Sequence, residues 1–135
     1  MRDIKFRAVY KGKVYKVTFI DFENKSVDID VNGVKITTSL NNTPIIRFTG
    51  LKDENGKDIY EDDLINVDGD IYRVMFKEMK INWFGEGRYF INFWALQSVK
   101  DELDILPLEN SFGTVVGNIY KNHELLEDKW KRYMF

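Results

Sequence analysis

Residues 48–65 read FTGLKDENGKDIYEDDLI and form the densest run of turn residues, charges and apolar anchors in the chain. Asn55-Gly56 is a strong tight-turn dipeptide, because both residues adopt positive φ at low steric cost. The apolar residues that flank this turn are Phe48, Leu51, Ile59, Tyr60, Leu64 and Ile65. The stretch carries no recognisable reaction chemistry, so we interpret it as a structural connector that organises the rest of the chain.

The chain has 135 residues and a mass of 16.0 kDa, which predicts a single domain with one core. We divide it into N-terminal hairpins (1–47), a barrel-like core (48–120) and a C-terminal helix (121–135). The absence of cysteine excludes disulfides, thiolate zinc sites and a cysteine nucleophile. Charged residues interrupt the first twenty residues, so neither a signal peptide nor a membrane span is predicted. We expect a soluble, cytoplasmic protein that makes no membrane contact.

The net charge of −2 is spread unevenly along the sequence. Residues 1–47 hold 9 basic and 5 acidic side chains, whereas residues 48–71 hold 2 basic and 8 acidic ones. Residues 72–100 are basic again and residues 101–135 are acidic. Such alternation suits complementary contacts within or between subunits better than a uniform nucleic-acid-binding face, which usually has a basic excess.

Apolar and polar residues alternate with the period of two that predicts strands. The clearest hairpin has Val27–Val31 and Val34–Thr38 on either side of the turn Asn32-Gly33. A second hairpin is predicted around Asp68-Gly69, with its returning strand ending at Lys77. Closely spaced short strands favour a small SH3-like barrel. The predicted class is therefore mainly β (α+β), with antiparallel hairpins, this barrel and a C-terminal α-helix.

Two helices are predicted toward the C-terminus. The acidic segment 97–109 could hold one short helix around Val99 to Leu103. Asn122 is a credible N-cap for a second helix that runs to about Met134, with basic residues near its end. Its apolar stripe would consist of Leu125, Leu126, Trp130, Tyr133 and Met134.

Residues 78–96 are the aromatic centre of the chain, and large side chains fall on both faces of the strand that ends it. One face would carry Tyr89, Ile91, Phe93 and Ala95, and the other Phe90, Trp94 and Leu96. Both faces then need cover, so we predict a homo-oligomer that buries part of this hairpin. The predicted interface residues are Trp83, Phe84, Tyr89, Phe90, Phe93 and Trp94. The alternative is that the C-terminal helix covers the second face with Leu126, Trp130 and Tyr133.

No pattern in the sequence assembles a catalytic or cofactor site. The spacing Gly50, Gly56, Lys57 is one residue too long for a phosphate-binding loop and lies in an acidic stretch. The acidic residues Asp53, Asp58, Glu61, Asp62 and Asp63 lack the glycine spacing of a calcium loop, and a solvated acidic turn explains them better. We expect no catalytic residue, no metal and no cofactor, and we assign Gly33, Gly50, Gly56 and Gly69 as structural turns.

His123 is the chain's single histidine, and every histidine-based reaction scheme would have to use it. Its position directly after Asn122 is explained by a place in the first helical turn. We therefore predict that the protein is not an enzyme, with undetected catalysis as an alternative. A further alternative is nucleic-acid binding through the basic segment 1–47 and the aromatic hairpin.

Three motifs in register resemble the YopX family over nearly the whole chain. They are Met1–Ala8, Thr49–Glu61 and Val116–Asn122. Asp62 departs from the family by standing where it usually has glycine, although aspartate tolerates left-handed backbone. Val9 stands where an aromatic is common, and His123 where proline often begins the helix. The resemblance implies a phage or prophage accessory protein that acts by binding, with a host or phage protein as a further partner, and it adds no catalytic residue.

Overall fold

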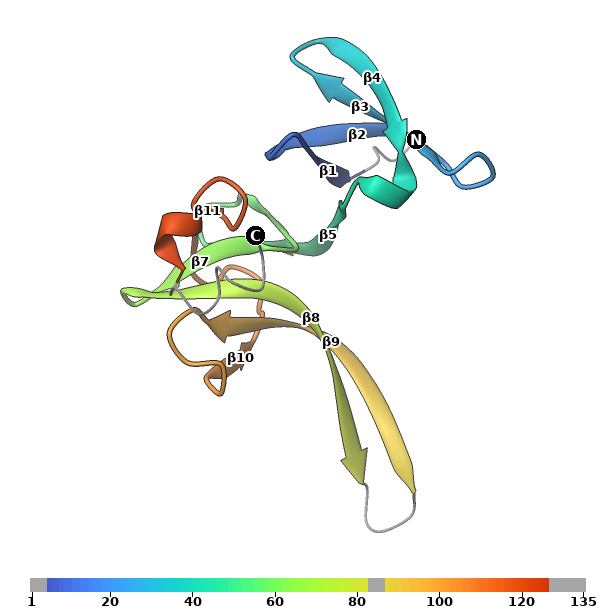
Figure 1. The fold of residues 1–135 in the computed structure, drawn as a ribbon. Coiled ribbons are helices and arrows are strands. Elements are labelled where there is room, and N and C mark those ends of the chain that lie inside the picture. Colours follow the sequence, from blue (N-terminus) through green and yellow to red (C-terminus); the bar gives the residue numbers. More distant parts are fainter. Residues whose placement is uncertain (1–4, 83–86, 127–135) are drawn as a thin grey trace. The chain divides into compact units, whose positions relative to one another are not determined.

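The structure is a computed structural model that describes residues 5–82 and 87–126. The chain divides into two compact units, Met1–Phe48 and Thr49–Phe135. Figure 1 shows that strands make up almost all of the regular structure in both units. A mainly β protein built from antiparallel hairpins is therefore confirmed.

The first unit is an antiparallel sheet of meandering strands. Its elements are β1 (Phe6–Tyr10), β2 (Lys13–Asp21), β3 (Ser26–Val31), β4 (Val34–Ser39) and the 3₁₀ helix η1 (Leu40–Asn42). The predicted Asn32-Gly33 hairpin forms, with Val31 opposite Val34 and both turn residues at positive φ. The alternating apolar side chains meet on one face, where Ala8, Val17, Val27 and Ile29 are fully buried.

Strand β5 (Ile45–Lys52) begins in the first unit, where it pairs with β1, and ends in the second. With β6 (Asp58–Tyr60) it completes a six-stranded sheet in the order β4-β3-β2-β1-β5-β6. The connector predicted at residues 48–65 thus contains the end of β5, the Asn55-Gly56 turn and β6.

The second sheet has the order β10-β9-β8-β7-β11. Its strands are β7 (Asp63–Val67), β8 (Asp70–Asn82), β9 (Arg88–Ser98), β10 (Ile105–Pro107) and β11 (Thr114–Asn118). The 3₁₀ helix η2 (His123–Leu125) follows. The core of this unit holds Ile59, Ile65, Tyr72, Val74, Leu96 and Leu108.

The predicted SH3-like barrel is wrong, because the described residues form two open sheets. Closure requires strands of matched length and stagger. Here β8 has 13 residues, whereas the outer strand β10 has 3 and ends at Pro107. The other outer strand, β11, has an irregular register at Val115. The two outer strands of this sheet, β10 and β11, do not pair with each other, so the sheet is open.

The predicted C-terminal α-helix is also wrong for residues 121–126, and its remainder, 127–135, lies outside the described residues. The Asn122 side chain accepts a hydrogen bond from the Asn118 backbone N–H at 3.2 Å and makes no cap bond. Leu126 has extended backbone and is buried with Leu64, Val99 and Ile119. Packing of Leu126 on the sheet therefore prevails over the local capping signal.

Candidate functional site

The hairpin of β8 and β9 extends past the strands on either side of it (Figure 1). Strand β7 pairs with β8 only over residues 70–73, and β10 pairs with β9 only over residues 95–97. We call the outer part of this hairpin, residues 76–82 and 88–93, the arm. Within the described residues the arm is a two-stranded ribbon, with no further strand paired along it.

Register decides which side chains share a face of the arm. Lys77 is opposite Phe93 and Met79 is opposite Ile91, so these four side chains lie on the same face. Ile105 and Pro107 of β10 lie on this face too, because they pair with Gln97 and Ala95. We call these residues the open face: Lys77, Met79, Ile91, Phe93, Ile105 and Pro107.

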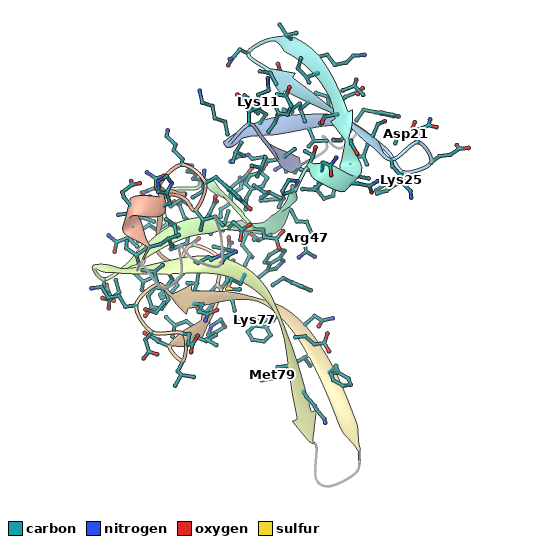
Figure 2. The ribbon with its side chains drawn as sticks, in the orientation of Figure 1. Lys11, Asp21, Lys25, Arg47, Lys77 and Met79 are labelled. Atoms are coloured by element: carbon teal, nitrogen blue, oxygen red, sulfur yellow. The ribbon has the colours of Figure 1, made fainter. Side chains whose placement is uncertain are left out.

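The open face carries an apolar groove of about 440 Å³. The groove is lined by Lys77, Glu78, Met79, Phe93, Ile105 and Pro107. Met79 is 47% exposed, Ile91 44% and Ile105 41%. Figure 2 labels Lys77 and Met79 where the arm leaves the sheet. The open face is thus an apolar surface with a single cation, Lys77, on it.

The opposite face of the hairpin continues the core. Phe76 lies opposite Trp94, their ring centroids are 5.0 Å apart, and Trp94 packs against the buried core cluster. Farther out, Phe90 is 61% exposed opposite Lys80. Packing against the core on this face therefore ends near Phe76. Beyond Phe76, the side chains on this face are more polar than those of the open face.

The predicted interface residues lie in different environments: the groove, the exposed outer part of the arm and the core. Phe93 is half-buried and lines the groove, Phe90 is exposed, and Trp94 packs on the core. Trp83 and Phe84 lie outside the described residues, as does the side chain of Tyr89. Lys77, Met79 and Ile105 were not predicted as interface residues. Met79 lies past Lys77, where the strand was predicted to end, and Ile105 reaches this face only through the pairing of β10 with β9. Continued alternation opposite residues 89–93 is the sequence signal that would have extended the predicted strand to Asn82.

The C-terminal segment covers the base of the same face. Leu64 pairs with Arg73, which precedes Lys77 by four residues and therefore lies on its face. Leu126 is 5% exposed and packs against Leu64. Of the covering residues predicted as the alternative, Leu126 thus reaches this face, whereas Trp130 and Tyr133 lie outside the described residues.

Asp53 organises the connector turn. Its carboxylate accepts backbone N–H bonds from Asn55 and Lys57, each at 2.9 Å, and from Val115 at 2.9 Å. Burial alone would raise the pKa of Asp53, but the bonds from Val115, Lys57 and Asn55 and the charge of Lys57 together hold it below its usual value. Asp53 is 2% exposed and Asp63 5%, so the expected solvated acidic turn is wrong for both.

Asp62 holds a second polar cluster. It has φ of 68°, a left-handed conformation that aspartate tolerates better than most residues. The Arg73 guanidinium donates to Asp62 Oδ1 from Nε at 3.1 Å and Nη2 at 2.9 Å, and the Tyr120 hydroxyl donates to Oδ2 at 2.8 Å. Burial and the charge of Asp62 raise the pKa of Tyr120. The Asp62 carboxylate thus binds both Arg73 and Tyr120, so we interpret this cluster as structural.

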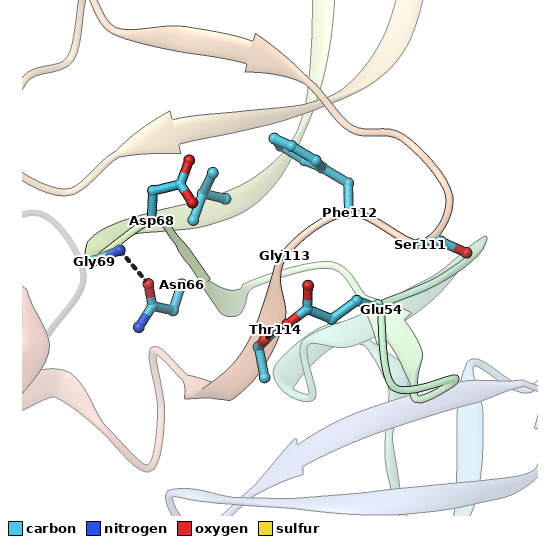
Figure 3. Close-up of a pocket in the computed structure, with 9 residues that line it drawn as sticks. Glu54, Asn66, Asp68, Gly69, Ser111, Phe112, Gly113 and Thr114 are labelled. Carbon is cyan, nitrogen blue, oxygen red and sulfur yellow. Dashed lines mark hydrogen bonds between the residues drawn. The ribbon is translucent and has the colours of Figure 1, made fainter.

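A polar pocket of about 330 Å³ lies between the Asp68-Gly69 turn and residues 111–114 (Figure 3). Thr114 donates to Glu54 at 2.6 Å, and the Gly69 N–H donates to the Asn66 side chain at 2.8 Å. The lining is mainly polar and carries the carboxylates of Glu54 and Asp68. Ligand pockets are usually apolar with a few convergent polar groups, which this pocket does not resemble.

His123 is exposed in η2. Across residues 5–82 and 87–126, no three His, Asp or Glu side chains lie close enough together to hold a metal ion. The same residues contain no helix long and apolar enough to cross a membrane. The four predicted turn glycines have positive φ: Gly33 at 89°, Gly50 at 85°, Gly56 at 80° and Gly69 at 92°.

Fold and geometry together define a mainly β protein with a two-stranded arm that presents an apolar groove. A family model described as YopX protein matches residues 4–127. The chain therefore belongs to the YopX family, as the three sequence motifs indicated. Comparison with curated proteins gave no match.

Proposed function

We propose that this protein is a non-catalytic binding module that self-associates through the open face of the arm. The observation that carries the proposal is the direct pairing of Met79 with Ile91, each almost half exposed, beside the apolar groove. A contiguous apolar surface on a soluble protein commonly marks an interaction site.

The energetics indicate how strong such a contact is. Completing the burial of a half-exposed large apolar side chain contributes about 1 kcal/mol. Four such side chains, Met79, Ile91, Phe93 and Ile105, would contribute on the order of 8 kcal/mol when two copies meet. Association costs roughly 4–15 kcal/mol in lost freedom and ordering. The open face alone thus supports weak association, and a tight complex needs further contacts.

Family membership supports a wider role as a phage or prophage accessory protein of the cytoplasm. A host or phage protein is the other partner to which the same apolar face is suited. The lack of cysteine fits a reducing compartment.

Two charge substitutions at neighbouring positions of β9 test the proposal. Ile91→Glu places a carboxylate on the open face, whereas Asn92→Glu places the same group on the opposite face. We expect Ile91→Glu to abolish self-association in sedimentation velocity, because a carboxylate buried without a partner costs several kcal/mol. Asn92→Glu should sediment as the wild type does. Equal effects of the two variants would overturn the proposal.

One observation favours nucleic-acid binding as a second candidate function. Arg7 and Lys16 lie opposite each other in the first sheet, so two basic side chains come together on one face of it. Asp30, on the other side of Lys16, offsets part of that charge. Anisotropy of a labelled single-stranded oligonucleotide tests this candidate. Binding that weakens with salt and is lost in Lys16→Gln would support it, and no binding at low salt would exclude it.

A further inference from the structure

The loop between β9 and β10 presents the most exposed large apolar side chain of the described residues. Leu103 is 86% exposed, compared with 77% for Phe22, the next highest. The short helix predicted around Val99 to Leu103 is wrong: residues 99–100 form a bend and residues 102–103 a turn, which the Asp104 N–H closes by donating to the Asp101 carbonyl at 3.0 Å. A leucine at the tip of an ordered turn is available as an anchor for an apolar groove.

Hydrogen bonds at both ends fix this loop. The Ser98 N–H donates to the Asp104 carbonyl at 2.9 Å, and the Ser98 hydroxyl accepts from the Lys100 and Asp101 N–H groups at 3.1 and 3.2 Å. The Leu103 N–H itself donates to the Asp101 carboxylate at 3.0 Å. A loop that is already ordered loses little conformational freedom on binding, so its contacts contribute fully to affinity.

Two further side chains attach the loop to the sheet. Gln97 Nε2 donates to the Glu102 carbonyl at 3.1 Å, and the Tyr72 hydroxyl donates to the Asp104 carboxylate at 3.0 Å. Both Gln97 and Tyr72 are buried, which connects the position of Leu103 to the core of the second unit.

The charges around Leu103 complement the open face. Exposed carboxylates flank it at Asp101, Glu102 and Asp104. The groove carries Lys77 on the open face, while Glu78 alternates to the opposite face and borders the groove. An acidic loop with an apolar tip is therefore suited to a groove of apolar side chains with a lysine among them.

The loop and the groove lie on either side of Ile105. Ile105 pairs with Gln97 and Pro107 with Ala95, so β10 runs from the loop toward the arm. The groove extends beyond it to Lys77 and Met79. A two-fold axis near Ile105 would bring the loop of each copy to the groove of the other, so both contacts form at once.

We propose that the Leu103 loop of a second copy of this chain docks in the groove of the open face. The inference rests on the proposed self-association and names the element that completes the contact. It also supplies the additional apolar burial that a tight complex of the open face requires.

A pair of complementary variants tests this contact in the full chain. Leu103→Lys brings a cation to a groove that already holds Lys77, and Met79→Glu places a carboxylate in that groove. We expect each variant alone to raise the dissociation constant of self-association by about 100-fold or more. A mixture of the two should form a heterodimer, because one contact stays intact and the other becomes an ion pair.

Phe22→Lys is the matched control, since Phe22 has similar exposure but lies in a turn of the first unit. It should associate as the wild type does, and thermal unfolding should show unchanged midpoints for all the variants at these exposed positions. If Leu103→Lys associates normally while Ile91→Glu is monomeric, the loop is not the occupant and the proposed function stands. If the mixture stays monomeric, the loop and groove are not partners. A monomeric wild type overturns both.

Discussion

Asp53 shows at the residue scale how one buried carboxylate can hold its own turn and also join that turn to a distant strand. The residue lies two positions before Asn55-Gly56, a spacing at which an aspartate can bond to its own turn, and it also holds Val115 from β11. The turn itself was predictable from the dipeptide. The bond to Val115 was not, because it joins residues 62 positions apart in the sequence.

Replacement of Asp53 by asparagine should lower the free energy of unfolding by about 2 kcal/mol, since at least one buried N–H group loses its charged acceptor. The folded-state pKa of Asp53 is depressed, so its contribution is present above the unfolded pKa near 4 and is lost as the pH falls through the folded value. Urea unfolding at pH 7 and pH 3 measures this. The stability difference between wild type and Asp53→Asn should shrink at pH 3, and an equal difference would contradict the assignment.

Gly56 adopts φ of 80° with no atom within 4 Å of where a Cβ would be. Substitution by valine is therefore opposed by the backbone alone, and Gly56→Val should cost more than about 1 kcal/mol. Gly56→Asn should cost less, because asparagine tolerates left-handed backbone. Gly33→Val should behave as Gly56→Val does. Unchanged denaturant midpoints for both valine variants would refute this reading of the turns.

At the scale of elements, the Asp62 cluster joins strand β8 to the segment after β11. Arg73 belongs to β8, and Tyr120 follows β11. The sequence indicated that aspartate could take the conformation of the family's glycine at position 62. It gave no sign that the carboxylate would bind Arg73 and Tyr120, since that depends on the register of β7 against β8.

We expect Tyr120→Phe to lower the free energy of unfolding by about 1 kcal/mol, the usual worth of one hydrogen bond. Asp62→Asn should cost more, roughly 3 kcal/mol, because it leaves the half-buried Arg73 without its charged partner. Denaturant unfolding of the two variants and their double mutant measures both effects. A larger loss in Tyr120→Phe than in Asp62→Asn would be inconsistent with Asp62 as the centre of the cluster.

Strands were more predictable than helices in this chain. Alternation of apolar residues identified the β3–β4 hairpin and the two faces of β9, because sheet burial and the period of two are directly linked. The C-terminal helix was predicted from a cap residue and a stripe, yet Leu126 packs on Leu64 instead. Such long-range packing cannot be inferred from local signals.

For the molecule as a whole, the sequence predicted that the aromatic hairpin needs cover on both faces. In the structure the open face exposes Met79 and Ile91, whereas the opposite face packs on the core through Trp94. Closure into a barrel depended on strand lengths that alternation did not reveal, since β8 continues to Asn82. The groove was beyond prediction because Ile105 and Pro107 reach it only through their pairing with β9.

Self-association is the central claim, and the mass of the wild-type protein tests it most directly. Light scattering coupled to gel filtration should give a multiple of 16.0 kDa at high concentration. The mass should fall toward 16.0 kDa on dilution into the micromolar range or below. A mass of 16.0 kDa at every concentration up to about 100 micromolar would contradict the account. The open face would then be covered within one chain, as in the alternative with Trp130 and Tyr133.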